Sequence, residues 1–347
     1  MTVALRSTCL KVSSLLVFML FFQLGRTQYD FSGLNSKFPQ LEKQAPNGNL
    51  AIMIYKDNKV VYNKASTDFP VNTQVHIGSA GKWMVAAMVL MLVDEGKISL
   101  DDKITKYLPI FQQYSKGYIT LRHCLYNMTG IAGDDGEGIN GDGKTLEDLV
   151  NSYAGTHEIE TNAGTAYKYS NIGINIAARI VEVVTKRDFE QIIQQRLFRP
   201  LSMRATTFAF NYDKGISPAN GGFSTAQDYL NFLSMLLNKG MFKGKPVMSE
   251  KAVNMLLQQP ISASDIKNIP EAVKGMAYVP GAWVVEQDAA GKGTCFTSPG
   301  YTGVWPVLDL CRGYASVVFV KGYQLTEKRA IYTDVKAVAD AQIQGGN

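Results

Sequence analysis

Histidine and cysteine are scarce in this chain of 347 residues, and their placement excludes several kinds of catalytic site. The three histidines are His76, His123 and His157. No two of them form a His-x-His or His-x-x-x-His pair, so a catalytic zinc centre is not expected. Around Ser79 the Gly-x-Ser-x-Gly motif is absent, and a histidine-based triad has no support. A glycine- and acid-rich stretch at 133–144 fails as a calcium loop because Ile139 stands where an acidic ligand is needed. We therefore expect chemistry without a metal or a cofactor.

Long apolar runs and a large excess of one charge are also absent. The apolar run 15–22 is too short to span a bilayer, and it follows Arg6 and Lys11. These features predict a signal peptide at 1–27 and an exported protein, periplasmic or extracellular, with one domain at 28–347. An uncleaved N-terminal anchor is the alternative. Beyond the signal peptide the chain carries 32 basic and 30 acidic residues and no second long apolar run, so neither a nucleic-acid nor a membrane partner is required.

Strand-like patterns stand at both ends of the domain, and helical patterns lie between them. The strand-like segments are a hairpin at 48–65 and the runs 281–285, 294–297, 304–308 and 314–320. The segment 79–95 is apolar nearly all round, which is typical of a buried helix. This order predicts an α+β fold. We expect an antiparallel sheet with flanking helices, built from about 45–78 and 275–340. A mainly helical region at about 79–274 is inserted, and we expect a cleft where this region meets the sheet.

Ser79 and Lys82 open the predicted buried helix. Residues three apart share one helix face, so the ammonium group of Lys82 can lie beside the hydroxyl of Ser79. Burial disfavours a charged lysine, which lets its side chain accept a proton from a weak nucleophile. The helix N-terminus also offers backbone N–H groups to a developing oxyanion. The alternative interpretation is a capping serine followed by a lysine that extends from a core helix to solvent.

A second polar cluster, Tyr169-Ser170-Asn171, precedes the next long helix. A phenol and an amide that project from a loop into a cleft can relay a proton and hold a substrate carbonyl. The alternative is that Ser170 or Asn171 caps the helix and Tyr169 only packs.

Taken in order, these segments resemble the serine β-lactamase and penicillin-binding protein superfamily, in its branch of class C β-lactamases, D-alanyl-D-alanine carboxypeptidases and esterases. The similar segments are 77–82, 92–102, 119–123, 128–131, 169–171 and 221–228. The resemblance implies a β-lactamase-like fold, an acylated nucleophile at Ser79 and proton transfers shared by Lys82 and Tyr169. It also implies that Asn171 holds the substrate carbonyl and that the backbone N–H groups of Ser79 and Tyr301 form the oxyanion hole.

At the third motif of that family, this chain departs from the pattern. Its members place Lys or His, a small residue and Gly on a strand that lines the cleft, whereas this chain has Ser298-Pro299-Gly300. Without the cation, β-lactam and D-alanyl peptide substrates become doubtful, and uncharged esters or amides become more plausible. Ser298 either donates a hydrogen bond to substrate or is a plain strand residue. Pro299 removes one ladder N–H, so an irregular strand is expected there.

Three cysteines remain once Cys9 leaves with the signal peptide. Cys295 and Cys311 flank Gly303 symmetrically, so a turn there places them opposite each other on antiparallel strands. We therefore predict a disulfide between them, and a buried thiol at Cys124.

These observations together predict an exported serine hydrolase that forms an acyl-enzyme on Ser79 and acts on a small ester, amide or peptide. The first alternative is a D-alanyl-D-alanine carboxypeptidase or a β-lactamase. The second is a non-catalytic binder of acyl or peptidoglycan-like ligands. The oligomeric state is left open.

Overall fold

The structure is a computed structural model, and it describes residues 29–133, 145–209, 216–258, 261–266, 269–322 and 329–343. The predicted signal peptide and nearly all of the glycine-rich stretch 133–144 lie outside these residues. Within the described residues, no helix combines the length and the apolarity that crossing a membrane requires.

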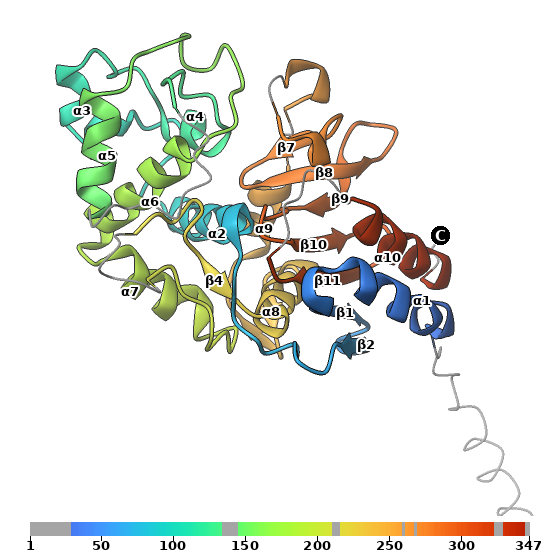
Figure 1. Cartoon of the computed structure of the whole chain (residues 1–347). Coiled ribbons are helices and arrows are strands. Elements are labelled where there is room, and N and C mark those ends of the chain that lie inside the picture. The colour runs from blue at the N-terminus through green and yellow to red at the C-terminus, as the bar shows by residue number, and fades with distance from the viewer. Residues whose placement is uncertain are drawn as a thin grey trace, which may run out of the picture. The chain divides into compact units, whose positions relative to one another are not determined.

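A seven-stranded sheet organises the domain, with the strand order β2-β1-β11-β10-β9-β8-β7 (Figure 1). Each neighbouring pair is antiparallel, and β1 from one end of the chain lies against β11 from the other. The strands are β1 (Leu50–Lys56), β2 (Lys59–Ala65), β7 (Ala277–Val279), β8 (Ala282–Gln287), β9 (Gly293–Thr297), β10 (Val304–Asp309) and β11 (Tyr314–Val320). The predicted α+β fold with an antiparallel sheet from both termini is thus confirmed. The three-residue strand β7 was not expected, nor were four two-residue strands outside this sheet, among them β3 (Val75–His76).

The sheet is covered on both faces, which explains why β11 is buried along its whole length. Side chains alternate between the faces of a strand. Phe319 packs edge-on against Tyr229 of α8 (Ala226–Leu237), with ring centroids 6.2 Å apart. From the opposite face, the Tyr314 hydroxyl donates to Asp340 of α10 (Arg329–Gln342) at 2.8 Å. The continuous apolar run of β11 therefore follows from two covered faces.

The inserted region is mainly helical, and α2 (Gly81–Asp94) lies at its centre. Every α2 residue from Gly81 to Leu92 is buried, and α2 packs against α6 and α9. Burial of each of its large apolar side chains contributes about 1.5–3 kcal/mol to stability. The other helices are α1 (Ser32–Gln44), α3 (Ile110–Gln113), α4 (Leu121–Leu125), α5 (Leu146–Gly155), α6 (Ile172–Thr185), α7 (Phe189–Ile193) and α9 (Glu250–Leu257).

The predicted disulfide is wrong, because the strand register differs from the one assumed. Cys295 pairs with Asp309 across β9 and β10, so Cys311 lies two residues beyond the position opposite Cys295. Cys295 is buried and Cys311 is exposed, and both are free thiols. Cys124 is buried, as predicted.

Candidate active site

Ser79 lies in a single 3-10 turn, Gly78–Ala80, that leads directly into α2. Gly78 has a φ of 52°, in the left-handed region that favours glycine. A side chain at Gly78 would also collide with Tyr301, because an added Cβ would lie 2.9 Å from the tyrosine ring. Gly78 and Ala80 are buried while Ser79 is partly exposed, so this turn presents the serine at the N-terminal end of α2.

Lys82 lies one turn further along and is only 1% exposed. Its Nζ donates to Ser79 Oγ at 3.0 Å, to Asn171 Oδ1 at 2.7 Å and to the Ala219 carbonyl oxygen at 3.1 Å. All three of these acceptors are neutral oxygens. The three-residue spacing therefore brings the serine and the lysine together, as the helical periodicity predicts.

Tyr169 and Asn171 enter the same site from the loop before α6. The Lys82 Nζ lies 4.9 Å from the centroid of the Tyr169 ring, and that ring packs against Trp283 of β8 at 5.5 Å. Asn171 occupies the N-cap position of α6 but makes no side-chain cap hydrogen bond. Its side-chain oxygen instead accepts from Lys82, so the site, rather than helix capping, accounts for this asparagine.

The sheet meets the Ser79 turn at Gly300 and Tyr301. An added Cβ on Gly300 would lie 2.0 Å from the Ile77 carbonyl oxygen, so only glycine allows the two backbones to pack this closely. The Tyr301 nitrogen lies 3.6 Å from the Cβ position of Gly78. The Tyr301 amide is thus next to the nucleophile turn, where the oxyanion hole was predicted.

Ser298 and Pro299 mark the end of the regular strand. Strand β9 stops at Thr297, and the backbone resumes pairing only at an isolated bridge between Gly300 and Val304. Ser298 is 3% exposed, and its hydroxyl donates to the Gly281 carbonyl oxygen at 2.8 Å. The Ser298 hydroxyl therefore donates its proton to a hydrogen bond within the protein. The irregular strand that was expected at Pro299 is present.

A buried asparagine in α6 supports the site and was not predicted. Asn175 is fully buried, and its Oδ1 accepts from the Ala219 backbone N–H at 3.0 Å. Its Nδ2 donates to the Ser217 hydroxyl at 3.2 Å. These bonds fix the segment whose Ala219 carbonyl accepts from Lys82. The available signal was an asparagine four residues after Asn171 on an otherwise apolar helix.

Two of the histidines, His76 and His123, have structural roles. The His76 ring lies 2.6 Å from the Asn220 carbonyl oxygen, and burial lowers the pKa of His76. His123 completes a reciprocal cap with Thr120 at the start of α4. Both contacts account for these residues without a catalytic role.

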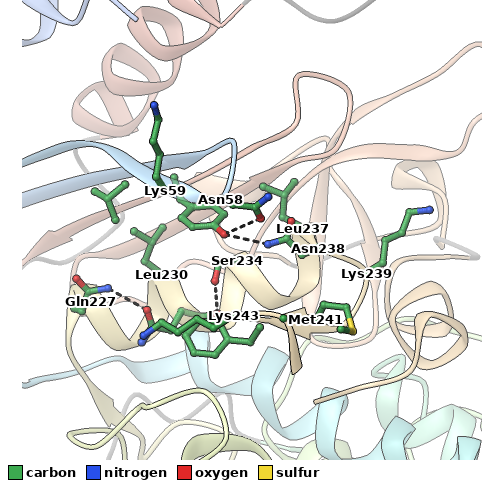
Figure 2. Close-up of a pocket in the computed structure, with 15 residues that line it drawn as sticks. Asn58, Lys59, Gln227, Leu230, Ser234, Leu237, Asn238, Lys239, Met241 and Lys243 are labelled. Carbon is green, nitrogen blue, oxygen red and sulfur yellow. Dashed lines mark hydrogen bonds between the residues drawn. The ribbon is translucent and has the colours of Figure 1, made fainter. Parts of the chain in front are cut away.

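A separate pocket of about 730 Å³ lies between the β1–β2 hairpin and α8 (Figure 2). None of the predicted site residues lines it. Asn238 Nδ2 donates to the Tyr55 hydroxyl at 3.0 Å, and that hydroxyl donates to Asn58 at 3.3 Å. Several of its polar groups are thus paired with one another, and the pocket holds none of the chemistry gathered around Ser79.

Comparison with known proteins places the chain among serine hydrolase relatives. A family model described as Beta-lactamase matches residues 34–341. Protein flp of Staphylococcus aureus (strain MW2) is 28% identical over 171 residues, which are 46% of this chain and 34% of that protein. The proposed penicillin-binding protein PbpX of Bacillus subtilis (strain 168) is 30% identical over 173 residues, 48% of this chain and 42% of that protein. The chain thus matches less than half the length of these relatives.

Solved structures share the fold over most of the chain. The crystal structure of a proposed β-lactamase from Bacteroides dorei DSM 17855 has a TM-score of 0.78 and 25% identity, and the match covers 90% of this chain and 99% of that one. EstCE1, a hydrolase with promiscuous acyltransferase activity, has a TM-score of 0.74 at 16% identity, with 88% and 98% covered, and so shows the fold alone. The chain therefore belongs to the Beta-lactamase family, within the superfamily of serine β-lactamases and penicillin-binding proteins.

Proposed function

We propose that this protein is an exported serine hydrolase that forms an acyl-enzyme on Ser79 and acts as an esterase or amidase on small substrates. The observation that carries the proposal is the 3.0 Å contact between Lys82 Nζ and Ser79 Oγ. A nucleophile and its base within hydrogen-bond reach, with a third group orienting the base, is the arrangement that covalent catalysis needs. Asn171 is the orienting group here. Export rests on the sequence of residues 1–27 alone.

The proposed reaction has two half-reactions. In the first, Lys82 acts in its neutral amine form, in which its Nζ accepts a hydrogen bond across the 3.0 Å contact with Ser79 instead of donating one. Ser79 Oγ forms a bond to the substrate carbonyl carbon, and its proton passes to Lys82 Nζ, directly or by way of Tyr169. The negative oxygen that results is stabilised by the backbone N–H groups of Ser79 and Tyr301. The leaving group then departs with the proton. In the second, water attacks the acyl carbon, the acid is released and Ser79 Oγ regains a proton.

The substrate preference follows from Ser298. The hydroxyl at this position donates to Gly281, and it carries no charge with which to hold a substrate carboxylate. Neutral esters and amides are therefore the first candidates. A D-alanyl-D-alanine carboxypeptidase or β-lactamase is the second, because one relative is described as a penicillin-binding protein. A non-catalytic binder is the third, and the intact Ser79, Lys82 and Tyr169 argue against it.

Intact-mass measurement tests the proposal. The mature protein is exposed briefly to 4-nitrophenyl acetate and, separately, to a penicillin, alongside Ser79→Ala and the control Ser36→Ala at an exposed serine of α1. We expect a transient acetyl adduct in the wild type and in Ser36→Ala, and none in Ser79→Ala. A persistent penicillin adduct would favour the peptidase. No Ser79-dependent adduct from either reagent would favour the binder.

A further inference from the structure

A small pocket lies on the Tyr301 side of the site and has no role in the reaction described above. Its volume is about 360 Å³, toward the lower end of the range of about 300–1,000 Å³ that is usual for small-molecule sites. The lining residues are Gln74, Val75, His76, Phe223, Tyr301, Thr302, Lys321 and Gly322. These residues come from the segment before Ser79, from β4 (Phe223–Ser224), and from the loops after Gly300 and after β11.

The walls of this pocket are mainly aromatic. The His76 ring lies 5.0 Å from the Phe223 ring and 5.8 Å from the Tyr301 ring, in tilted and edge-on arrangements. His76 is also held by the Asn220 carbonyl oxygen, so the ring has a fixed position. A planar or apolar group therefore finds a preformed surface here.

Among the described lining residues, Lys321 is the one lysine or arginine. No aspartate or glutamate is among these residues. Lys321 is exposed at the rim of the pocket. An apolar pocket with a cation at its rim complements a group that is apolar along its length and anionic at its end.

Tyr301 connects this pocket to Ser79. Its ring lines the pocket and also packs against Gly78, the residue before the nucleophile. Its backbone N–H is half of the proposed oxyanion hole. A substrate whose carbonyl oxygen is held there has its acyl carbon near Tyr301, the residue that the proposed reaction site and this pocket share.

We infer that this pocket is the acyl-group subsite of the enzyme and that Lys321 gives it a preference for acyl groups that end in an anion. This inference rests on the proposed function. Because Lys321 is exposed, its ion pair with substrate tunes selectivity and is not a requirement for turnover. The chemical class assigned to the subsite is an aromatic or short apolar acyl group with a terminal carboxylate.

The test compares kcat/KM for three 4-nitrophenyl esters that differ only in the para substituent of the acyl ring: benzoate, 4-carboxybenzoate and 4-(trimethylammonio)benzoate. The wild type is expected to favour the carboxylate over the ammonium ester. Lys321→Gln should lower this ratio by about fivefold, the effect of one well-placed exposed ion pair, and Lys321→Glu should lower it further. Salt should weaken the preference, because the screening length is about 8 Å at 0.15 M.

Lys243→Gln is the matched control, since Lys243 lines the separate pocket of Figure 2. Its ratio should equal that of the wild type. If the benzoate ester is hydrolysed through Ser79 and the ratio does not change in Lys321→Gln and Lys321→Glu, the subsite is wrong while the proposed function stands. If none of the esters is hydrolysed in a Ser79-dependent way, the proposed function fails, and the subsite fails with it.

Discussion

Lys82 and Lys336 are both largely withdrawn from solvent, and they have opposite surroundings. Lys82 is 1% exposed and donates to the neutral oxygens of Ser79, Asn171 and Ala219. The Lys336 side chain is 15% exposed, and its Nζ lies 2.6 Å from Glu286 and from Asp340. The Lys82 amine thus donates to neutral oxygens, whereas the Lys336 ammonium group lies against carboxylates that stabilise its charge.

Lys336 belongs to a cluster that fastens α10 to the sheet. Its partners Glu286 and Asp309 come from β8 and β10, and Arg312 bonds both of these carboxylates at 2.8 Å and 2.7 Å. Burial lowers the pKa of Lys336, but the carboxylates of Asp340 and Glu286 outweigh burial and raise the pKa above its ordinary value. Glu286, Cys295 and Asp309 also lie close enough together to hold a metal ion. Both of these carboxylates already form ion pairs with Arg312 and Lys336, which join α10 to the sheet.

The comparison shows that burial of a lysine does not by itself define its role. Carboxylates keep an ammonium group charged, which suits an anchor. Hydroxyl, amide and carbonyl oxygens provide hydrogen bonds without a countercharge, which suits a group that must gain and lose a proton.

The largest expected effect is on catalysis at Lys82. Lys82→Met should lower kcat/KM for 4-nitrophenyl acetate by about 10²–10⁴-fold, the usual contribution of a positioned acid or base. The free energy of unfolding should fall by about 1–3 kcal/mol, because Met leaves the oxygens of Asn171 and Ala219 without this donor. Ester kinetics and urea denaturation of one preparation measure both. Full activity in Lys82→Met would show that Lys82 is not the acid or base of the reaction, and the contrast with Lys336 would then be wrong.

The second effect is on stability at Lys336. Lys336→Met leaves Glu286, Asp309 and Asp340 with only Arg312 to balance them. Removal of one partner from such a cluster costs about 3–5 kcal/mol. The activity per folded molecule should stay at the wild-type level, which separates this variant from Lys82→Met. A wild-type unfolding midpoint would show that the cluster does not anchor α10.

The third effect is a pH dependence of stability to which the Lys336 cluster contributes. Burial raises the pKa of Glu286, while Arg312 and Lys336 lower it by more, so the folded value lies below the ordinary 4.5. A lowered carboxyl pKa contributes stability above the unfolded value, and that stability is lost as the pH falls through the folded value. The Tm should therefore drop below about pH 4.5, and less steeply in Glu286→Gln. Glu250→Gln, at an exposed pair with Lys239, should follow the wild type.

The surroundings of Lys82 and Lys336 show how much of the structure could be predicted from the sequence. The Ser79–Lys82 contact was predicted because both residues lie on one helical turn, and β11 was predicted over its full length because the pattern is local. Asn175 and Ala219 join the site from distant segments, and nothing in the local pattern pairs them. The Lys336 cluster needs α10 to dock on β8, fifty residues away in sequence, so no spacing could reveal it.

The wrong disulfide has a similar origin. The prediction assumed a symmetric turn about Gly303, whereas Cys295 pairs with Asp309. A shift of two positions in the strand register decided the outcome, and the local sequence does not reveal that register.

The smallest expected effect is on the rate of chemical labelling of Cys295, which tests whether Lys336 holds α10 in place. Burial raises the pKa of the Cys295 thiol well above its ordinary value, so in the native protein iodoacetamide should modify exposed Cys311 and spare Cys295. Because Cys295 lies in the cluster that Lys336 closes, Lys336→Met should speed Cys295 labelling, whereas Lys82→Met should not. Peptide mapping after timed alkylation measures the two rates separately. Equal Cys295 labelling in both variants would mean that α10 stays docked without Lys336, and the anchor would then have to be assigned to Arg312.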